Sequence, residues 1–321
     1  MTNILDLRNE YREKKKVYAS EKLEFSGVGG RDVYNCSVPF EFDGKTYIFG
    51  RVERREEWAS STTHLFCKNE ENVWQKVISF DPLPLEDPYV VKIHDEYVVA
   101  GTHVVKEKGT VKTYCCYFYR GKDLFSLRYW TTGPDYMKDI RLAELQNGKV
   151  CVFSRPRNED ILKEYGCESQ VGAILIDSLD ELCADVICKA NYIKGMFNEG
   201  EWGGLNQAFV LEKELVGAIG HQCYTNDKNC AVYVNTAYVI DLSKNKVVLK
   251  KVIGEREDYP KSASKITQLS DCAFTSGLVY RPDGKADLYS GLSDVGEGKI
   301  VIDDPFSGIK KFTEKHGERI A

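Results

Sequence analysis

Asp87, which lies between Glu86 and Pro88, is the carboxyl group in this sequence that is best placed for acid–base chemistry. Pro84 and Pro88 stiffen the backbone on both sides of it. An apolar strand-like run follows directly, so the carboxyl would be removed from water and suited to act as a general acid. The alternative is a plain Asp–Pro turn, of which Asp304-Pro305 is a second example in the chain. Asp304 lies outside the internal repeat of this chain, and we interpret it as a turn.

A set of basic residues indicates what kind of ligand binds near Asp87. These residues lie at the edges of apolar segments: Arg51, Arg141, Arg155 and His221. The planar fork of arginine pairs with two phosphate oxygens at once, so the set predicts a phosphate site. The alternative is that the arginines pair internally with acidic residues of the same region, namely Glu53, Asp139 and Asp294.

Further polar side chains stand at the ends of apolar segments, where core packing does not explain them. We predict that they bind the polar groups of a substrate: Asn35, Asp139, Asn206, Asp271 and Asp294. For any one of them, the turn chemistry of Asn and Asp is an adequate explanation. Their recurrence at similar positions of an internal repeat favours a shared binding funnel.

That repeat consists of an alternating apolar run, a polar turn and a second apolar run that ends in a small and a polar residue. It occurs five times, at residues 38–51, 88–102, 140–155, 207–221 and 277–291. Polar turns between alternating runs are hairpin signals, and strand-like stretches at 114–119, 171–176 and 232–240 supply outer strands. Four-stranded units repeated radially form a β-propeller. We therefore predict an all-β fold, a five-bladed propeller over residues 27–321, in preference to a β-sandwich.

Residues 1–26 are expected to form a helical arm or cap, with a helix from Ile4 to Phe25. This segment is highly charged and carries few apolar residues. It either packs on the outside of the propeller or extends into solvent. The N-terminus has no apolar core and no small-residue cleavage site, which argues against a secretory signal.

Composition excludes several function classes. The 321-residue chain is 42% hydrophobic and 29% charged, with a formal net charge of −5. A nucleic-acid-binding protein usually carries a basic face, and no apolar run approaches the roughly 20 residues of a membrane span. We expect no nucleic acid and no membrane among the partners, and the oligomeric state is not defined by the sequence.

The eleven cysteines indicate free thiols rather than disulfides. Most lie inside apolar runs, where a thiol behaves as a small hydrophobic group. An odd count in a long chain without an export signal is typical of a reducing cytoplasm. No Cys-x-x-Cys pair occurs, so we predict no metal site and no cofactor.

Four motifs together carry a family resemblance: Gly30-Arg31-Asp32-Val33-Tyr34-Asn35, Glu86-Asp87-Pro88, Lys138-Asp139-Ile140-Arg141 and Tyr289-Ser290-Gly291-Leu292-Ser293-Asp294. The ordered set resembles a small family of mannosyltransferases and phosphorylases that make and degrade β-1,2-mannan. That family, long known only as a domain of unknown function, is related to the glycoside hydrolase family 130 β-mannoside phosphorylases. The resemblance spans about residues 27–304.

The resemblance implies an inverting β-mannoside phosphorylase. Asp87 would protonate the leaving oxygen, directly or through a sugar hydroxyl, and inorganic phosphate would attack the anomeric carbon to give α-mannose 1-phosphate. Phosphate or mannose 1-phosphate would be the co-substrate, with a β-1,2-manno-oligosaccharide as partner. An inverting hydrolase needs a second carboxylate about 6.5–9.5 Å from the acid, and Asp139 keeps that reaction open. A mannosyltransferase that uses GDP-mannose and a non-catalytic sugar-binding propeller also fit these residues.

Overall fold

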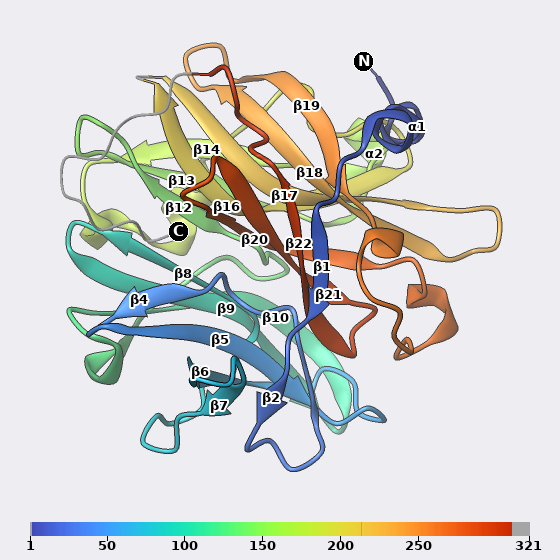
Figure 1. Cartoon of the computed structure of the whole chain (residues 1–321). Coiled ribbons are helices and arrows are strands. Elements are labelled where there is room, and N and C mark those ends of the chain that lie inside the picture. The colour runs from blue at the N-terminus through green and yellow to red at the C-terminus, as the bar shows by residue number, and fades with distance from the viewer. Residues whose placement is uncertain (1, 213, 310–321) are drawn as a thin grey trace.

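The computed structural model describes residues 2–212 and 214–309, which form five sheets arranged radially as the blades of a β-propeller (Figure 1). The predicted fold class is confirmed. Blades 2 to 5 each have four strands, and every neighbouring pair within them is antiparallel. Residues 310–321, which the prediction assigned to the propeller, lie outside the described residues.

The strands follow the repeat in order. Blade 1 contains β2 (Phe25–Ser26), β3 (Asp32–Tyr34), β4 (Phe40–Phe42), β5 (Lys45–Glu53), β6 (Thr62–Lys68) and β7 (Trp74–Lys76). Blade 2 contains β8 (Glu86–Ile93), β9 (Glu96–Glu107), β10 (Thr110–Gly121) and β11 (Arg128–Thr132). Blade 3 contains β12 (Arg141–Glu144), β13 (Val150–Ser154), β14 (Gly172–Ile176) and β15 (Asn191–Tyr192).

Blade 4 contains β16 (Glu201–Glu212), β17 (Leu215–Thr225), β18 (Ala231–Asp241) and β19 (Lys246–Gly254). Blade 5 contains β20 (Ala273–Tyr280), β21 (Lys285–Leu292), β22 (Gly296–Asp303) and β1 (Ala19–Lys22). Short helices α2 (Glu159–Tyr165) and α3 (Ala184–Ile187) lie in the long connections of blade 3.

The first hairpin of each blade turns where the sequence predicts it. Asp43 and Gly44 both have positive φ, at 47° and 69°, as the favoured two-residue hairpin turn requires. His94 and Asp95 adopt the same left-handed conformation at 48° and 64° without a glycine. Because these turns fix the pairing register, the residues at the opposite ends of the two strands are fixed as well.

The ring of blades is closed by the N-terminal strand β1, which pairs with β22 from Ala19↔Val301 to Lys22↔Gly298. The outer strand of the last blade therefore comes from the beginning of the chain. The expected helix from Ile4 to Phe25 was too long: α1 covers Ile4–Lys14, and the residues that follow form β1 and β2. No glycine or proline marks this helix end, and the run of lysines there continues the charged pattern of α1.

Helix α1 packs against the outside of blade 4, beside β19 in Figure 1. Asn3 caps its N-terminus by accepting a hydrogen bond from the backbone NH of Asp6. Ile4 and Leu7 are buried against Val232, Val234 and Val252. Of the two expectations for this segment, the packed cap is therefore confirmed.

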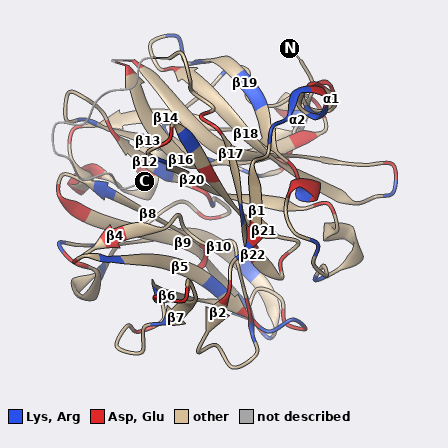
Figure 2. Ribbon diagram, in the orientation of Figure 1, with Lys and Arg blue, Asp and Glu red and all other residues tan. Residues whose placement is uncertain are grey.

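The apolar core is divided among the interfaces between neighbouring blades. In one such interface, Val98 and Phe118 of blade 2 pack against Leu142 and Val152 of blade 3. All eleven cysteines are free, and most are buried, as expected. Among the described residues no helix is long and apolar enough to cross a membrane. In the view of Figure 2, charged residues of both signs are interspersed, and no side of the ribbon carries one sign alone.

Candidate active site

The innermost strand of every blade is irregular at one equivalent place. In blades 2, 4 and 5 the pairing slips by one residue between Glu86 and Tyr89, Leu205 and Gln207, and Thr275 and Gly277. In blades 1 and 3 the strand is interrupted at the same level. The residues at these five irregularities are Asn35, Asp87, Asp139, Asn206 and Ser276. Bulges commonly redirect side chains toward functional sites.

Three of these residues have a left-handed backbone: φ is 46° at Asn35, 48° at Asp87 and 56° at Asp139. Asn and Asp tolerate this conformation better than other residues with a side chain. All three side chains are buried, with Asp87 only 5% exposed. The turn preference of Asn and Asp, which was the alternative explanation for these positions, is therefore part of how the site is built.

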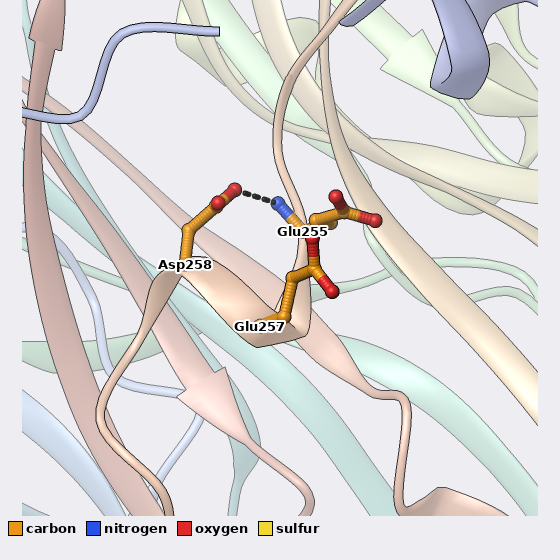
Figure 3. A group of neighbouring side chains, drawn as sticks. All are labelled: Glu255, Glu257 and Asp258. Carbon is orange, nitrogen blue, oxygen red and sulfur yellow. Dashed lines mark hydrogen bonds between the residues drawn. The ribbon is translucent and has the colours of Figure 1, made fainter. Parts of the chain in front are cut away.

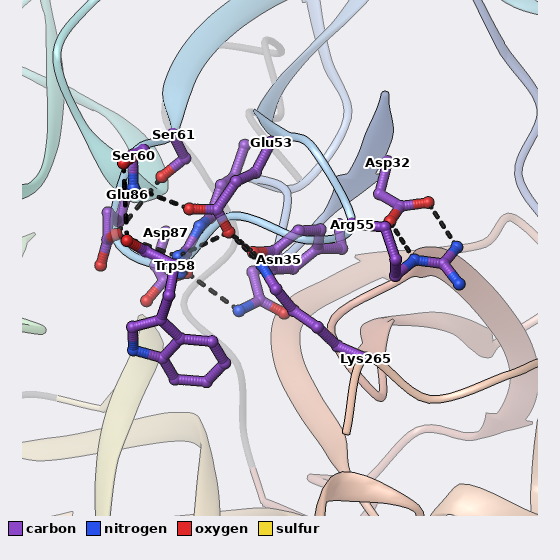
Figure 4. A network of polar contacts seen from close by, with 12 residues as sticks. Asp32, Asn35, Glu53, Arg55, Trp58, Ser60, Ser61, Glu86, Asp87 and Lys265 are labelled. Atoms are coloured by element: carbon purple, nitrogen blue, oxygen red, sulfur yellow. Dashed lines mark hydrogen bonds and ion pairs between the residues drawn. The ribbon is translucent and has the colours of Figure 1, made fainter. Parts of the chain in front are cut away.

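Asp87 belongs to a cluster on blades 1, 2 and 5 (Figure 4). Its Oδ1 accepts hydrogen bonds from Nδ2 of Asn35 at 2.9 Å and from Nη1 of Arg51 at 3.0 Å. Nη2 of Arg51 donates to Glu86 at 2.9 Å and lies 3.5 Å from Glu53. None of these contacts uses Oδ2 of Asp87, so that oxygen remains for a ligand.

Lys265 reaches this cluster from the long connection between blades 4 and 5. Its ammonium forms an ion pair with Glu53 and lies 3.3 Å from the hydroxyl of Tyr34. Tyr34 also donates to Glu53 at 2.6 Å, and its ring faces the guanidinium of Arg51 at 4.9 Å. Sequence reasoning missed Lys265, because it lies outside the repeat in a segment without strand pattern.

Acidic groups outnumber cations in this cluster, and the excess negative charge contributes to raised pKa values of two carboxyl groups. Partial burial raises the pKa of Glu86, and the negative charge of Asp87 adds to the effect. Partial burial likewise raises the pKa of Asp294, with a further contribution from Asp87. Arg51 opposes both shifts. The cluster is therefore able to hold a proton beside Asp87.

A second cluster, on blades 3 and 4, is built around Asp139. Oδ2 of Asp139 lies 3.1 Å from Nη1 of Arg155, and Oδ1 lies 3.6 Å from Nη2 of Arg141. Burial by itself would raise the pKa of Asp139, but Arg155 and Arg141 outweigh it and hold the pKa well below its usual range. Asp139 is therefore an ionised partner of two arginines, one of the arrangements that the sequence left open.

Backbone carbonyls fix the orientation of both arginines. Nε of Arg141 donates to the carbonyl of Asn206 at 2.9 Å, and Nε of Arg155 donates to the carbonyl of Gly203 at 2.6 Å. A Cβ on the adjacent Gly204 would lie only 3.3 Å from Nε of Arg155. The two guanidinium groups are thus held in place before any ligand arrives.

His221 lies in the same cluster, in contact with Asn206 through its Nδ1 at 2.8 Å from Oδ1. Burial lowers the pKa of His221 to about 3 despite the nearby Asp139. The imidazole is therefore neutral at neutral pH, and the prediction that it adds positive charge to the funnel was wrong. It contributes a hydrogen-bonding nitrogen instead, because Nδ1 must donate to the amide oxygen and Nε2 is left as an acceptor.

Lys138 connects the two clusters electrostatically. Its positive charge contributes to the low pKa of Asp139 and His221, and it partly opposes the rise in the pKa of Glu86 and Asp294. Among the described residues, Lys138 forms no ion pair within 4.0 Å. Lys138 therefore acts on the carboxyl groups of both clusters. It lies in one of the four motifs but was not predicted as a site residue.

Two predicted site residues are placed differently from expectation. Asp271 lies five residues before Ser276, and its carboxylate binds Arg8 of α1 at 2.8 Å. This ion pair connects Asp271 to the cap, and Ser276 lies at the position in blade 5 that corresponds to Asp87. The prediction that Asp271 binds substrate assumed that the Asp before the strand marks the register, whereas the bulge lies at Ser276. Arg51 is surrounded by Asp87, Glu86 and Glu53, so its charge is already compensated. This geometry assigns Arg51 to positioning Asp87, not to phosphate.

Two buried polar atoms of the Asp87 cluster, Oδ1 of Asn35 and Nε of Arg51, have no hydrogen-bond partner among the described residues. Buried polar groups are normally satisfied, and exceptions call for an explanation such as a ligand. In the second cluster, Oδ2 of Asp139 and Nη1 of Arg155 make no hydrogen bond of good geometry, but they face each other at 3.1 Å as an ion pair.

Among the described residues, one set of three carboxylates has oxygens close enough together to hold a metal ion: Glu255, Glu257 and Asp258 (Figure 3). The ammonium of Lys15 contacts all three, at 3.3, 2.7 and 2.8 Å respectively. Arg8 and Arg12 add two further contacts to Glu255. This group therefore binds the basic side chains of the N-terminal cap, away from the two clusters.

Taken together, the site offers a carboxyl group for proton transfer and two guanidinium groups for an anion. Blades 5, 1 and 2 carry the Asp87 cluster, blade 3 carries Asp139 with Arg141 and Arg155, and blade 4 carries Asn206 and His221. The guanidinium of Arg141 lies over the ring of Tyr89 at 4.7 Å, so the two clusters are neighbours at the inner ends of blades 2 and 3. A sugar bound between them would contact both the carboxyl group of Asp87 and the cationic residues.

Known proteins share both the sequence pattern and the fold of this chain. A family model described as "Protein of unknown function (DUF1861)" matches residues 9–308. The chain is similar to the structure of MPT-4, a mannose phosphorylase from Leishmania mexicana in complex with phosphate ion. The two share 43% identity over 97% of this chain and 98% of that one, with a TM-score of 0.88. A search of curated proteins returned no match.

A second similar structure is MPT-1, a GDP-Man-dependent mannosyltransferase from Leishmania mexicana. It shares 40% identity over 97% of both chains, with a TM-score of 0.88. A structure from the GH130 family of mannoside phosphorylases aligns over 88% of this chain and 87% of that one. At 13% identity and a TM-score of 0.59, it supports the fold alone.

Proposed function

The chain belongs to the DUF1861 family, and from this premise we propose that it is an inverting β-mannoside phosphorylase. It would cleave β-1,2-linked manno-oligosaccharides reversibly with phosphate and release α-mannose 1-phosphate. The family resemblance drawn from the four motifs is confirmed, because a mannose phosphorylase is 43% identical over nearly the whole chain. The linkage and the stereochemistry are part of the proposal.

The observation that carries the proposal is the presence of two buried clusters at the inner strands, one with the carboxyl group of Asp87 held by Arg51 and one with Arg141 and Arg155 around Asp139. Inversion requires the nucleophile to attack the anomeric carbon from the face opposite the leaving group. A sugar bound between the clusters meets that requirement. Its glycosidic oxygen would face Asp87, and phosphate would lie against the cationic side.

In the cleavage direction Asp87 gives its proton to the glycosidic oxygen, directly or through a sugar hydroxyl, as the bond from that oxygen to the anomeric carbon breaks. A phosphate oxygen forms the new bond to the same carbon. Asn35 and Arg51 hold Oδ1 of Asp87, so Oδ2 faces the sugar. In the synthetic direction Asp87 removes the proton from the acceptor hydroxyl, a role that its charged form next to Arg51 suits.

Phosphate supplies the negative charge that the Asp139 cluster is built to receive. Arg141 and Arg155 are oriented by backbone carbonyls, and Lys138 adds a third positive charge. Neutral His221 offers Nε2 as an acceptor, which suits a protonated phosphate oxygen or a sugar hydroxyl. Asn206 fixes the imidazole, and Asp139 fixes the arginines.

Hydrolysis would need a carboxylate that is free to deprotonate water on the side opposite Asp87. Asp139 is the carboxylate on that side, and both of its oxygens face arginines. A water molecule would have to compete with two guanidinium groups for its lone pairs. Phosphate is already anionic and needs no such base, so this arrangement favours phosphorolysis.

Transfer from GDP-mannose is a second candidate. It is supported by the similarity to MPT-1, whose 40% identity is close to the 43% found with MPT-4. In that reaction the β-phosphate of the nucleotide would occupy the place that we assign to inorganic phosphate. Asp87 would again remove the proton of the acceptor hydroxyl, so one set of residues serves both reactions.

The two candidates are separated by supplying an oligomannoside acceptor with either mannose 1-phosphate or GDP-mannose. The proposal expects chain extension from mannose 1-phosphate with release of inorganic phosphate. Extension from GDP-mannose alone would establish the transferase instead. Binding of the oligosaccharide without turnover under either condition would indicate a non-catalytic sugar-binding propeller.

The eleven free thiols also support the proposed cytoplasmic location, since they need a reducing compartment to stay unpaired. Neither reaction calls for a metal or an organic cofactor, and we propose that inorganic phosphate or a phosphorylated sugar is the only co-substrate.

A further inference from the structure

An exposed tryptophan lies beside the Asp87 cluster, and neither the reaction above nor the family comparison assigns it a role. Trp58 is 56% exposed and lies in the connection between β5 and β6 (Figure 4). The chain has four tryptophans, and Trp74 and Trp202 are buried in the propeller. A large aromatic ring that is exposed to solvent beside a polar site is suited to bind a ligand with an apolar face.

The loop that carries Trp58 is fixed to the acidic residues of the site. The backbone NH of Ser60 donates to Glu53 at 2.7 Å, and the hydroxyl of Ser61 lies 3.3 Å from Glu86. From blade 2, Lys106 donates to the carbonyl of Trp58 at 2.6 Å. The backbone that carries the indole is therefore held in place by residues that also contact Arg51.

One face of the indole is already in contact with the cluster. The ammonium of Lys265 lies 5.2 Å from the centre of the ring, while it pairs with Glu53 and contacts Tyr34. This cation–π contact orients the ring relative to the carboxyl groups. Figure 4 shows Trp58 close to Glu86 and Asp87, with its indole pointing away from the two carboxyl groups.

We propose that Trp58 is the stacking platform for the sugar unit on the leaving-group side, which is the acceptor sugar in synthesis; this rests on the function proposed above. Asp87 protonates the leaving oxygen, so the leaving sugar must lie on the side of Asp87, away from the arginines. Trp58 lies on the Asp87 side, because its loop is hydrogen-bonded to Glu53 and Glu86. The C–H face of a mannosyl ring would pack on the exposed face of the indole, opposite the face that Lys265 covers.

The proposal predicts a selective effect on the acceptor. In the synthetic direction, Trp58→Ala should raise the KM for a β-1,2-mannobiose acceptor by about three- to tenfold, the range for loss of one aromatic contact. The KM for mannose 1-phosphate and kcat should change less than about twofold, since the arginine side is untouched. Trp58→Phe should recover most of the loss. Phe125→Ala, which removes an exposed ring of blade 2 away from the site, is the matched control and should leave all three constants unchanged.

A binding measurement keeps the result independent of turnover. We expect β-1,2-mannotriose to change the tryptophan fluorescence of Asp87→Asn protein, and this change should disappear in Asp87→Asn/Trp58→Phe. Unchanged acceptor KM in Trp58→Ala, or an equal rise in the KM for mannose 1-phosphate, would overturn the proposal. If neither the unaltered protein nor any variant extends the acceptor, the proposed function fails. The fluorescence titration then tests the stacking role of Trp58 by itself. A mannotriose signal that survives Trp58→Phe would overturn that role.

Discussion

Arg51 and Asp87 are joined across the boundary between blades 1 and 2, with Nη1 of Arg51 3.0 Å from Oδ1 of Asp87. The same guanidinium contacts Glu86 and Glu53, so one buried cation organises three carboxylates. The contact uses Oδ1 of Asp87, the same oxygen that accepts from Asn35. This ion pair therefore positions the residue to which we assign proton transfer.

Asp87→Asn should abolish turnover and preserve the fold. Asparagine tolerates the left-handed backbone at this position, where φ is 48°, and it can still accept from Arg51. Loss of general acid–base catalysis should lower kcat at least about 100-fold. The measurement is initial rate in both directions, together with the melting temperature of the variant.

Asp304→Asn is the matched control, because Asp304 also precedes a proline but caps a turn through the backbone NH of Phe306. Its activity should equal that of the unaltered protein. Activity of Asp87→Asn within about threefold of normal would move the acid role to another residue.

Arg51→Met should be strongly destabilising, because it leaves Glu53, Glu86 and Asp87 without their shared buried cation. Breaking a buried ion pair by removing one partner costs about 3–5 kcal/mol. Arg55→Met removes the more exposed pair between Arg55 and Asp32 and should cost no more than about 1 kcal/mol. Urea denaturation measures both, and losses of equal size would contradict the organising role of Arg51.

Lys138→Met should weaken phosphate binding without unfolding the protein. Lys138 acts on both clusters and has no ion-pair partner of its own among the described residues, so its removal leaves no orphaned charge. We expect the KM for phosphate to rise at least about tenfold and Lys138→Arg to restore part of it. Lys149→Met, at the opposite end of blade 3, should leave this KM unchanged. An unchanged KM in Lys138→Met would remove Lys138 from the phosphate site.

Glu297 should make stability fall as pH rises. Burial raises the pKa of Glu297 to about 8, while the carboxyl accepts from Ser276 at 2.6 Å and from the backbone NH of Cys36 at 3.1 Å. Between the ordinary carboxyl pKa and about pH 8 the folded protein keeps a proton that the unfolded chain releases. The free energy of unfolding therefore decreases through this window, by up to about 1.4 kcal/mol per pH unit.

Glu297→Gln replaces the protonated carboxyl with a neutral amide and should flatten that part of the profile. The check is urea denaturation at intervals from pH 5 to pH 9. Glu10→Gln, on the exposed side of α1, should keep the original slope. The same slope in Glu297→Gln would show that another group is responsible.

The five hairpins were predictable because each depends on local signals: alternation in the strands and a polar turn, which contains Asn, Asp or Gly in every blade except blade 4. Asp87 and Asp139 could be placed at the axis for the same reason, since the turn fixes the register of the strand. The closure by β1 was not predictable, because four exposed residues carry no burial pattern and their partner lies about 280 positions away.

The site was predicted less completely, for two physical reasons. Lys265 and Trp58 come from connections outside the repeat, where no periodicity relates sequence position to place in the fold. Asp271 was predicted at the axis, but the bulge of blade 5 lies at Ser276 and Arg8 binds the carboxylate of Asp271. Which arginines are already paired with carboxylates depends on contacts between residues that are far apart in the sequence. Nothing in the sequence separates Arg51, which has three acidic contacts, from Arg155.

The most direct test of the account is an NMR time course of β-1,2-mannobiose with the protein, with and without inorganic phosphate. We predict that α-mannose 1-phosphate and mannose form in equal amounts when phosphate is present, and that neither forms in its absence. Release of free mannose alone without phosphate, or formation of the β-anomer of mannose 1-phosphate, would contradict inverting phosphorolysis across the Asp87 and Arg155 clusters.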